Sequence, residues 1–417
     1  MQISLQRYSD ICLSLSGWAF VLAVFFAPFS TASLNTLTIL GFVLWFISGR
    51  FPQHCRLLAR NTICRTLFVF VALLTVSTLW STTTLEMALD GLKSYRKILF
   101  FFAVFGIVWF LPQWKEKILW ASLISGVVSA LACVCVYLHV PGFPAPDPGQ
   151  GAIFMKNHIT QGFLMGLLVL LSVRVACFYP DKKVKLLGLL ATCLAIFVSF
   201  YTINGRTGFL SVGVAAGSLV LFLPQTFKQK VSLFALIAII MASILATSDR
   251  FQDRFIQATE EIELYTEEQA PVKQKTSMGL RLLFWERGLD IVQKAPFFGH
   301  GVGSWSDEFD RDQLEDGIKK GDALYQVCGN PHNDYIMVAA QVGVMGLMIW
   351  LLFLGLMYRF GKLMPLKDSF LLHGFLLMYS AGCLFNSFTY DVTEGTLLFI
   401  LTACLLAPYF RETRIYE

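Results

Sequence analysis

Charged residues are scarce in this sequence of 417 residues. Asp, Glu, Lys and Arg together make up 15% of the chain, whereas a soluble globular chain carries about 25%. Hydrophobic residues make up 56%, and phenylalanine alone occurs 38 times. The net charge of +5 is small, and the basic residues lie mostly in short segments between apolar runs. This distribution is typical of a membrane topology signal and argues against a nucleic-acid partner. The composition therefore indicates a polytopic membrane protein.

Metal-binding and disulfide patterns are also missing. The ten cysteines are scattered, most of them in apolar segments, and no Cys/His spacing resembles a zinc site. Cys328 is alone in the one long polar segment, so no disulfide can form within that segment. We interpret the cysteines as small buried hydrophobic residues. No small-residue cleavage site follows the first apolar run, so we expect that run to be retained as a span.

The apolar runs predict an all-α integral membrane protein. A span needs about 20 apolar residues, and lipid offers no partners to backbone groups outside a helix. The candidate spans are 12–30, 31–49, 67–81, 96–111, 118–139, 159–178, 186–203, 207–223, 231–247, 334–358, 369–386 and 394–410. We therefore predict about twelve transmembrane helices, with no internal repeat of the kind that transporters show.

The short loops carry a charge bias. Loops 50–66, 179–185 and 359–367 hold most of the basic residues on one side, and the positive-inside rule makes that side cytoplasmic. Both termini then lie in the cytoplasm and segment 248–333 lies outside. The predicted division is nine spans in 1–247, an external loop 248–333, and three spans with a short cytoplasmic tail in 334–417.

The external segment contains a predicted amphipathic helix at 278–294. Leu280, Phe284, Gly288 and Ile291 recur at helical spacing, and Pro296 marks the end of the helix. An external loop of this length usually has a function or is disordered, and the Glu-rich part 260–268 is the candidate for disorder.

A histidine precedes the tenth apolar run, in the sequence Asn-Pro-His-Asn-Asp-Tyr. Either Asn333 or Asp334 can cap the helix that follows. His332 would then lie at the positive end of the helix dipole, which favours a neutral imidazole. A neutral ring with a free nitrogen is what a general base requires. The alternative is a capping histidine at the membrane interface with no chemistry.

Two arginines occupy apolar surroundings on the external side. Arg206 separates two apolar runs, and Arg281 lies on the predicted loop helix. An arginine in such a place needs a partner, and its planar fork matches a phosphate or a carboxylate. The alternative is that both side chains only cover apolar surface while their charged ends reach water.

Other residues are weaker candidates. The glycine-rich sequence 298–305 is either an anion-binding turn or a plain turn, and the acidic run 307–312 is either a cation site or a solvated face. Four further polar residues lie in external segments and are possible supporting residues: Lys93, Arg96, His158 and Asp391.

Together these motifs resemble the O-antigen ligase/polymerase superfamily of Gram-negative bacteria. The resemblance rests on Gly-Arg-Thr-Gly at 205–208, Arg281 in the external loop, the Gly-x-Gly turn, and Pro-His-Asn-Asp-Tyr at 331–335. The length and the span layout are most similar to the ligase. The resemblance implies a helical membrane fold of the C-type glycosyltransferase kind in the bacterial inner membrane, with a periplasmic active site.

The resemblance also implies a reaction. A metal-independent glycosyltransferase without cofactors would move a polysaccharide from undecaprenyl diphosphate to lipid A–core oligosaccharide. Arg206 and Arg281 match the arginines that hold the diphosphate, His332 matches the catalytic base, and Asp391 matches an acidic position near the site. Asn333 and Tyr335 belong to the same motif as His332. Two guanidinium groups can stabilise the growing charge in place of a metal, and a single displacement would invert the anomeric centre.

Three alternatives stay open at this point. A polymerase or a protein O-oligosaccharyltransferase would use the same donor and differ only in the acceptor. A transporter or flippase of lipid-linked glycan would favour charges deep within the spans, and a structural subunit would not need the three site residues to converge.

Overall fold

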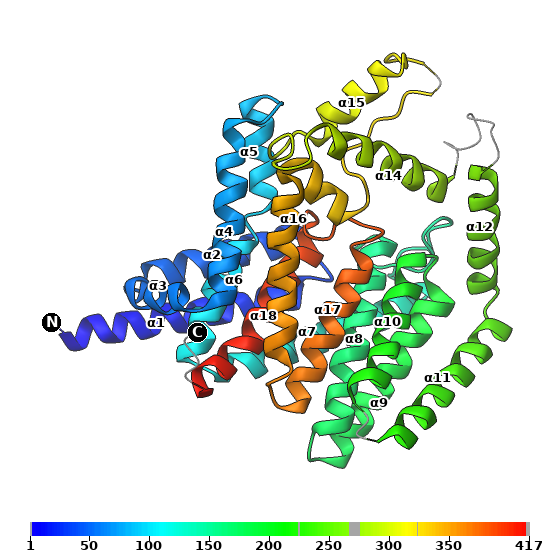
Figure 1. Cartoon of the computed structure of the whole chain (residues 1–417). Helices are drawn as coiled ribbons and strands as arrows, with labels where there is room; N and C mark the ends of the chain where they lie inside the picture. Colours follow the sequence, from blue (N-terminus) through cyan, green and yellow to red (C-terminus); the bar gives the residue numbers. More distant parts are fainter. Residues whose placement is uncertain (1, 224–225, 267–275, 323, 414–417) are drawn as a thin grey trace.

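The computed structural model describes residues 2–223, 226–266, 276–322 and 324–413, and these residues are helical with no strand beyond two isolated bridges (Figure 1). The elements are α1 (Gln2–Phe26), α2 (Thr31–Ile47), α3 (Phe51–Arg60), α4 (Thr62–Val76), η1 (Ser77–Leu79), α5 (Leu85–Ser94), α6 (Ile98–Phe110), α7 (Gln113–Tyr137), α8 (His158–Phe178), α9 (Lys182–Phe197), η2 (Val198–Thr202), α10 (Arg206–Phe222), α11 (Phe227–Thr247), α12 (Asp249–Thr266), α14 (Ser277–Lys294), α15 (Trp305–Glu315), α16 (Asp334–Gly361), α17 (Leu366–Gly382) and α18 (Val392–Thr413).

Eight of the described helices are long and apolar enough to cross a membrane, and the pair α2 and α3, bent by 102°, would make a ninth. α10 is apolar but shorter, with 17 residues, and α6 has only 13. An all-α membrane protein is therefore confirmed. The count of twelve spans, the three-part division of the chain and the orientation of its termini stay predictions.

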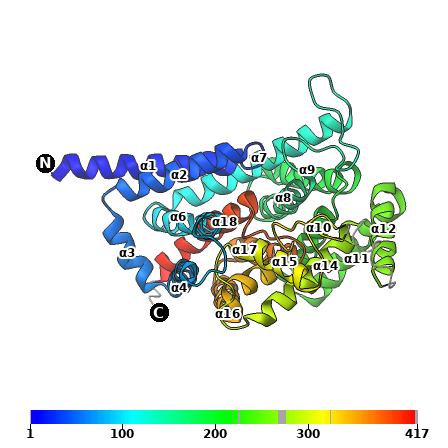
Figure 2. The same cartoon turned by 90° about the horizontal axis from the view of Figure 1, so that it is seen from above.

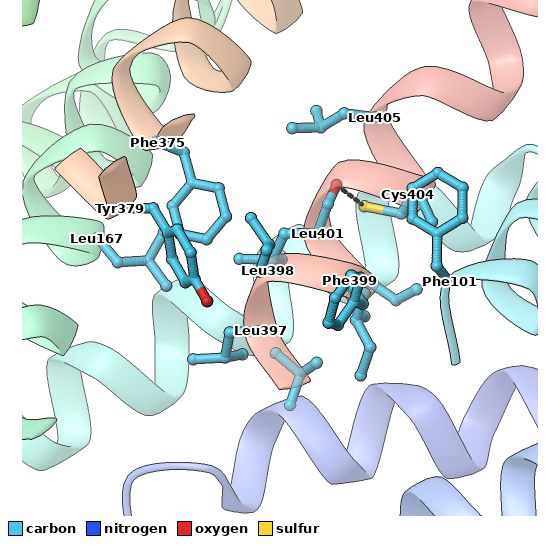
Figure 3. Close-up of a cluster of buried hydrophobic side chains, with 14 of the residues drawn as sticks. Phe101, Leu167, Phe375, Tyr379, Leu397, Leu398, Phe399, Leu401, Cys404 and Leu405 are labelled. Atoms are coloured by element: carbon cyan, nitrogen blue, oxygen red, sulfur yellow. Dashed lines mark hydrogen bonds between the residues drawn. The ribbon is translucent and has the colours of Figure 1, made fainter. Parts of the chain in front are cut away.

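The most deeply buried span is α18. In α18, 94% of the most apolar stretch of 18 residues is buried inside the protein, whereas in α11 only 6% of the corresponding stretch is buried. Figure 3 shows leucines of α18 between Phe101 of α6 on one side and Phe375 and Tyr379 of α17 on the other. Figure 2 shows α1 and α2 along one side of the molecule and α11 and α12 on the far side. The apolar surface that α11 leaves exposed is what a lipid-facing helix presents.

The amphipathic helix predicted at 278–294 is confirmed as α14. Phe284, Gly288 and Ile291 are buried, and Leu280 packs against the same small core, which also contains residues of α15 and α16. The next helix, α15, carries the acidic run, and its Asp312 accepts hydrogen bonds from basic side chains of α14. α14 is thus packed between α15 and the start of α16.

The glycine-rich turn packs closely against two other segments. A Cβ on Gly303 would lie 2.4 Å from the carbonyl oxygen of Met87, and its φ of +82° favours glycine. The turn also enters a break in α16, where Gly343 has φ +68°. The backbone N–H groups of His300 and Gly301 donate to the carbonyls of Ala340 (2.9 Å) and Gln341 (2.8 Å). Close packing against neighbouring backbone therefore explains the glycines of segment 298–305, as expected for a plain turn.

Candidate active site

His332 is held in an uncommon backbone conformation. Its φ is +49°, and its N–H donates to the side-chain oxygen of Asn330 at 2.9 Å. The ring stacks near Phe284 of α14, with centroids 6.4 Å apart. A non-glycine residue at positive φ costs about 1–3 kcal/mol, and such strain clusters at functional sites.

Asn333, and not Asp334, caps α16. The Asn333 side-chain oxygen accepts the N–H groups of Tyr335 (3.0 Å) and Ile336 (3.1 Å). The Asn333 amide donates to the carbonyl of Leu384 at 3.1 Å. The sequence had left both residues open as caps, and only one of them faces the free backbone donors of the first turn.

Asp334 and Tyr335 fasten the motif to the connection between α17 and α18. The buried carboxylate of Asp334 accepts hydrogen bonds from the hydroxyl of Thr389 and from its N–H group (3.3 Å). The hydroxyl of Tyr335 donates to the carbonyl of Ser380 at 2.9 Å. His332 therefore projects from a turn that is fixed on both sides.

The ring nitrogens of His332 form no hydrogen bond with any residue that the structure describes. Burial lowers the pKa of His332, and the positive charge of Arg281 lowers it further. This direction agrees with the predicted neutral imidazole, although the causes are burial and an arginine and not the helix dipole. The ring is thus able to accept a proton near neutral pH.

Arg206 and Arg281 line one cavity of about 410 Å³ between α10, α12 and α14. Arg206 is the first residue of α10, and Arg281 lies in the second turn of α14. Three arginines line the cavity: Arg206, Arg254 and Arg281. The rest of its wall is largely apolar and consists of Thr207, Phe209, Leu210, Phe251, Phe255, Ala258, Met278 and Phe385. Such a wall suits an anionic head group attached to an apolar chain.

The two arginines differ in their partners. Arg206 forms a two-pronged ion pair with Glu261 of α12, at 2.9 and 2.7 Å. Arg281 makes no hydrogen bond or ion pair within the described residues. Burial lowers the pKa of Arg281, and the charge of Arg206 lowers it further. Two like charges at one cavity are stabilised when an anion binds between them.

His158 also lies beside this cavity. It begins α8 and packs against Gly205, where a Cβ would lie 3.0 Å from the His158 ring. It is close enough to Arg254 and Arg281 to interact with both charges. Its ring nitrogen Nδ1 lies 3.3 Å from the side-chain oxygen of Gln150.

Asp391 lies in the connection between α17 and α18. Burial raises the pKa of Asp391, and the nearby carboxylate of Glu394 raises it further. Its electrostatic neighbours also include Asp334, two residues after His332. Asp391 therefore lies near the start of α16 and does not line the arginine cavity.

Lys93 and Arg96 do not line the cavity either. Lys93 is exposed and pairs with Asp90 at 2.6 Å on α5. Arg96 donates to the carbonyl of Lys93 (2.8 Å) and to the side chain of Asn35 (2.9 Å). Their charges are satisfied locally, so the structure does not link them to the anion site.

Two residues at the site were not singled out from the sequence: Arg254, which lines the cavity, and Glu261, which pairs with Arg206. Both belong to α12, on which Phe251, Arg254, Ala258 and Glu261 recur at spacings of three and four. That spacing is the signal of one helix face. Arg254 donates to the carbonyl of Gly149 at 3.1 Å, which keeps its side chain near the cavity.

Metal ligands do not converge in the described residues. No three His, Cys, Asp or Glu side chains there are arranged to hold a metal ion. The acidic run of α15 instead forms ion pairs: Asp312 with Arg287 at 2.7 Å and with Lys294 at 2.8 Å.

The fold and the site define a polytopic helical membrane protein with an arginine-lined cavity next to a histidine at a helix start. Residues 189–351 match the family model described as O-antigen ligase, and this segment contains Arg206, Arg281 and His332. This match and the similarity to an O-antigen ligase described below support membership of the O-antigen ligase superfamily.

Two curated relatives are similar over part of their length. An uncharacterized protein of Haemophilus influenzae is 30% identical over 243 residues, 56% of this chain and 57% of that protein. An O-antigen ligase of Escherichia coli (strain K12) is 28% identical over 174 residues, 42% of this chain and 40% of that protein. The matched segments thus span about half of each relative.

Proposed function

We propose that this protein is a metal-independent, inverting glycosyltransferase that moves O-antigen polysaccharide from undecaprenyl diphosphate to lipid A–core oligosaccharide on the periplasmic face of the inner membrane. The observation that carries the proposal is the cavity that Arg206 and Arg281 share. Arg281 is also close enough to His332 for its positive charge to lower the pKa of that histidine.

In this reaction one hydroxyl oxygen of the acceptor bonds to the anomeric carbon of the glycan. The bond between that carbon and the phosphate oxygen breaks, and undecaprenyl diphosphate leaves with the electron pair. His332 takes the hydroxyl proton, and attack from the face opposite the leaving group inverts the anomeric centre.

The arginines supply the electrostatic part of catalysis. Negative charge on the diphosphate grows as the glycosidic bond breaks, and two guanidinium groups stabilise it most when it is largest. Each can bind phosphate oxygens through parallel N–H donors, which a point charge such as lysine does not offer. The apolar wall of the cavity keeps the effective dielectric constant low and strengthens these interactions.

The test is a reconstituted reaction with purified full-length protein, undecaprenyl-diphosphate-linked glycan and lipid A–core. We expect a glycan ladder on lipid A–core that disappears with His332→Ala. A ladder of free lipid-linked polymer would instead indicate a polymerase, and glycan on an added acceptor protein would indicate an oligosaccharyltransferase. Movement of the donor across proteoliposomes without transfer would indicate a flippase and contradict the proposal.

A further inference from the structure

Glu261 of α12 contacts both of the helices that carry Arg206 and Arg281. Its carboxylate accepts hydrogen bonds from both terminal nitrogens of Arg206, at 2.9 and 2.7 Å, and from the backbone N–H of Met278, at 2.9 Å. Met278 lies in the first turn of α14, three residues before Arg281. Figure 1 shows α12 beside the start of α14. One carboxylate therefore connects the start of α10 with the start of α14.

The contact with Met278 satisfies a helix terminus. The first four N–H groups of a helix have no partner within it. Thr276 accepts the N–H of Gly279 at 3.0 Å, and Glu261 accepts that of Met278. A carboxylate at this end also interacts favourably with the helix dipole.

The buried Nε–H donor of Arg206 is unused. Both of its terminal nitrogens bond Glu261, but its Nε is buried and has no partner among the described residues. A buried N–H without an acceptor costs about 1–3 kcal/mol. Because Arg206 lines the cavity, a phosphate oxygen bound there would supply the missing acceptor.

Glu261 also reduces the repulsion between the cationic side chains. The positive charge of Arg206 lowers the pKa of Arg281, and the negative charge of Glu261 raises it. Burial raises the pKa of Glu261, but hydrogen bonds from Arg206 and Met278 outweigh burial and lower the pKa below its usual value. The carboxylate is therefore ionised at neutral pH.

We propose that Glu261 is a positioning residue for the lipid diphosphate. It fixes the guanidinium of Arg206 through the two terminal nitrogens, and it fixes the start of α14 through the N–H of Met278. The Nε–H of Arg206 and the guanidinium of Arg281 can then bind the same anion. This inference rests on the proposed function, because it takes the diphosphate as the ligand of the cavity. The opposite role is that of a built-in competitor, in which Glu261 occupies Arg206 until the diphosphate displaces it.

The two roles predict opposite results in a binding experiment on the purified full-length protein with undecaprenyl diphosphate as the probe. If Glu261 positions Arg206, Glu261→Gln should weaken binding about tenfold, which corresponds to about 1.4 kcal/mol. Glu260→Gln, an exposed neighbour on α12, is the matched control and should bind as the wild type does. Unchanged or tighter binding by Glu261→Gln would overturn the inference, and tighter binding would identify the competitor.

A double variant tests whether Glu261 acts through Arg206. Arg206→Ala should weaken binding, and Glu261→Gln added to it should cause a smaller further loss than it does alone, because only the contact of Glu261 with Met278 then remains to be lost. Additive losses would indicate a general structural role and overturn the inference. Glu261→Asp keeps the charge on a shorter side chain; we expect a higher donor KM with an unchanged acceptor KM. Unchanged values of both constants would count against positioning, even where Glu261→Gln does not fold.

Failure of the inference can be separated from failure of the proposed function. If the wild type does not bind undecaprenyl diphosphate, or if Arg206→Ala binds it equally well, the donor site itself is disproved and the role of Glu261 with it. If Arg206→Ala weakens binding and Glu261→Gln does not, only the inference fails.

Discussion

The ammonium group of Lys97 donates a hydrogen bond of 2.6 Å to the backbone carbonyl oxygen of Asp391. A second bond, of 2.7 Å, goes to the carbonyl of Tyr390, and the Lys97 residue is only 1% exposed. The connection between α17 and α18, which anchors the His332 turn through Thr389, is thus held from the opposite side by one lysine.

Replacing this lysine should destabilise the protein. Lys97→Met removes the donor of the part-buried Tyr390 carbonyl and one of two donors of the Asp391 carbonyl, which also accepts the N–H of Gly395. A buried acceptor left without a donor costs about 1–3 kcal/mol. We expect the free energy of unfolding to fall by about 3 kcal/mol and thermal unfolding in detergent to move to a lower temperature. Lys93→Met, at an exposed position, should change neither. Equal melting of Lys97→Met and the wild type would show that the Lys97 contacts are not needed.

Arg281→Lys should raise the donor KM by about 10- to 100-fold, because lysine lacks the planar fork that matches phosphate. Steady-state kinetics at varied donor concentration measures this effect. Arg287→Lys is a control on the same helix, since Arg287 pairs with Asp312 of α15 and does not line the cavity. A normal donor KM for Arg281→Lys would show that Arg281 does not bind the diphosphate.

His332→Ala should reduce transfer by about 100- to 10,000-fold, the usual contribution of a general base, while donor binding persists. Turnover and equilibrium binding are measured on the same preparation. His139→Ala, in the exposed segment after α7, should leave both unchanged. Near-normal turnover by His332→Ala would remove this residue from catalysis.

The pH dependence should report the lowered pKa of His332. A base works in its neutral form, which is present above its pKa. Activity should therefore hold as the pH falls through the ordinary histidine value of about 6.5, and it should decline only below that. In Arg281→Met the residual activity should decline at a higher pH, because one cause of the lowered pKa has been removed. A pH–rate profile with the same acid limb in both proteins would contradict the assignment.

EDTA should not inhibit transfer, because the proposed reaction uses arginines where other enzymes use a divalent cation. The measurement is the initial rate after chelation and after adding Mg²⁺ or Mn²⁺ back. Strong inhibition that a divalent ion reverses would favour a metal site and contradict this mechanism.

The sequence predicted those features whose signals are local. The apolar spacing of α14 and the placing of His332 just before a helix start depend on neighbouring residues, and the structure has both. The convergence of Arg206 and Arg281 was inferred from the resemblance, and the shared cavity agrees with it. The span count is harder to predict, because short apolar helices such as α6 are buried among other helices and need not match the bilayer thickness.

The features that the sequence did not reveal depend on distant partners. Arg206 and Glu261 are 55 positions apart, and only the fold brings them together. Lys93 and Arg96 are the reverse case: their charge suggested an anion, but Asp90 and Asn35 already satisfy them. An isolated charge in a sequence does not tell whether its partner is a ligand or another residue.

The break in α16 has a consequence for the biogenesis of this protein. The backbone N–H of Val344 donates to the carbonyl of Pro296 at 2.8 Å, and the carbonyl of Gln341 accepts the N–H of Gly301. In a bilayer these groups would have no partners until segment 296–301 arrives. Segment 296–301 must therefore be in place before this helix can reach its final shape, so the folding of the two is a single cooperative step.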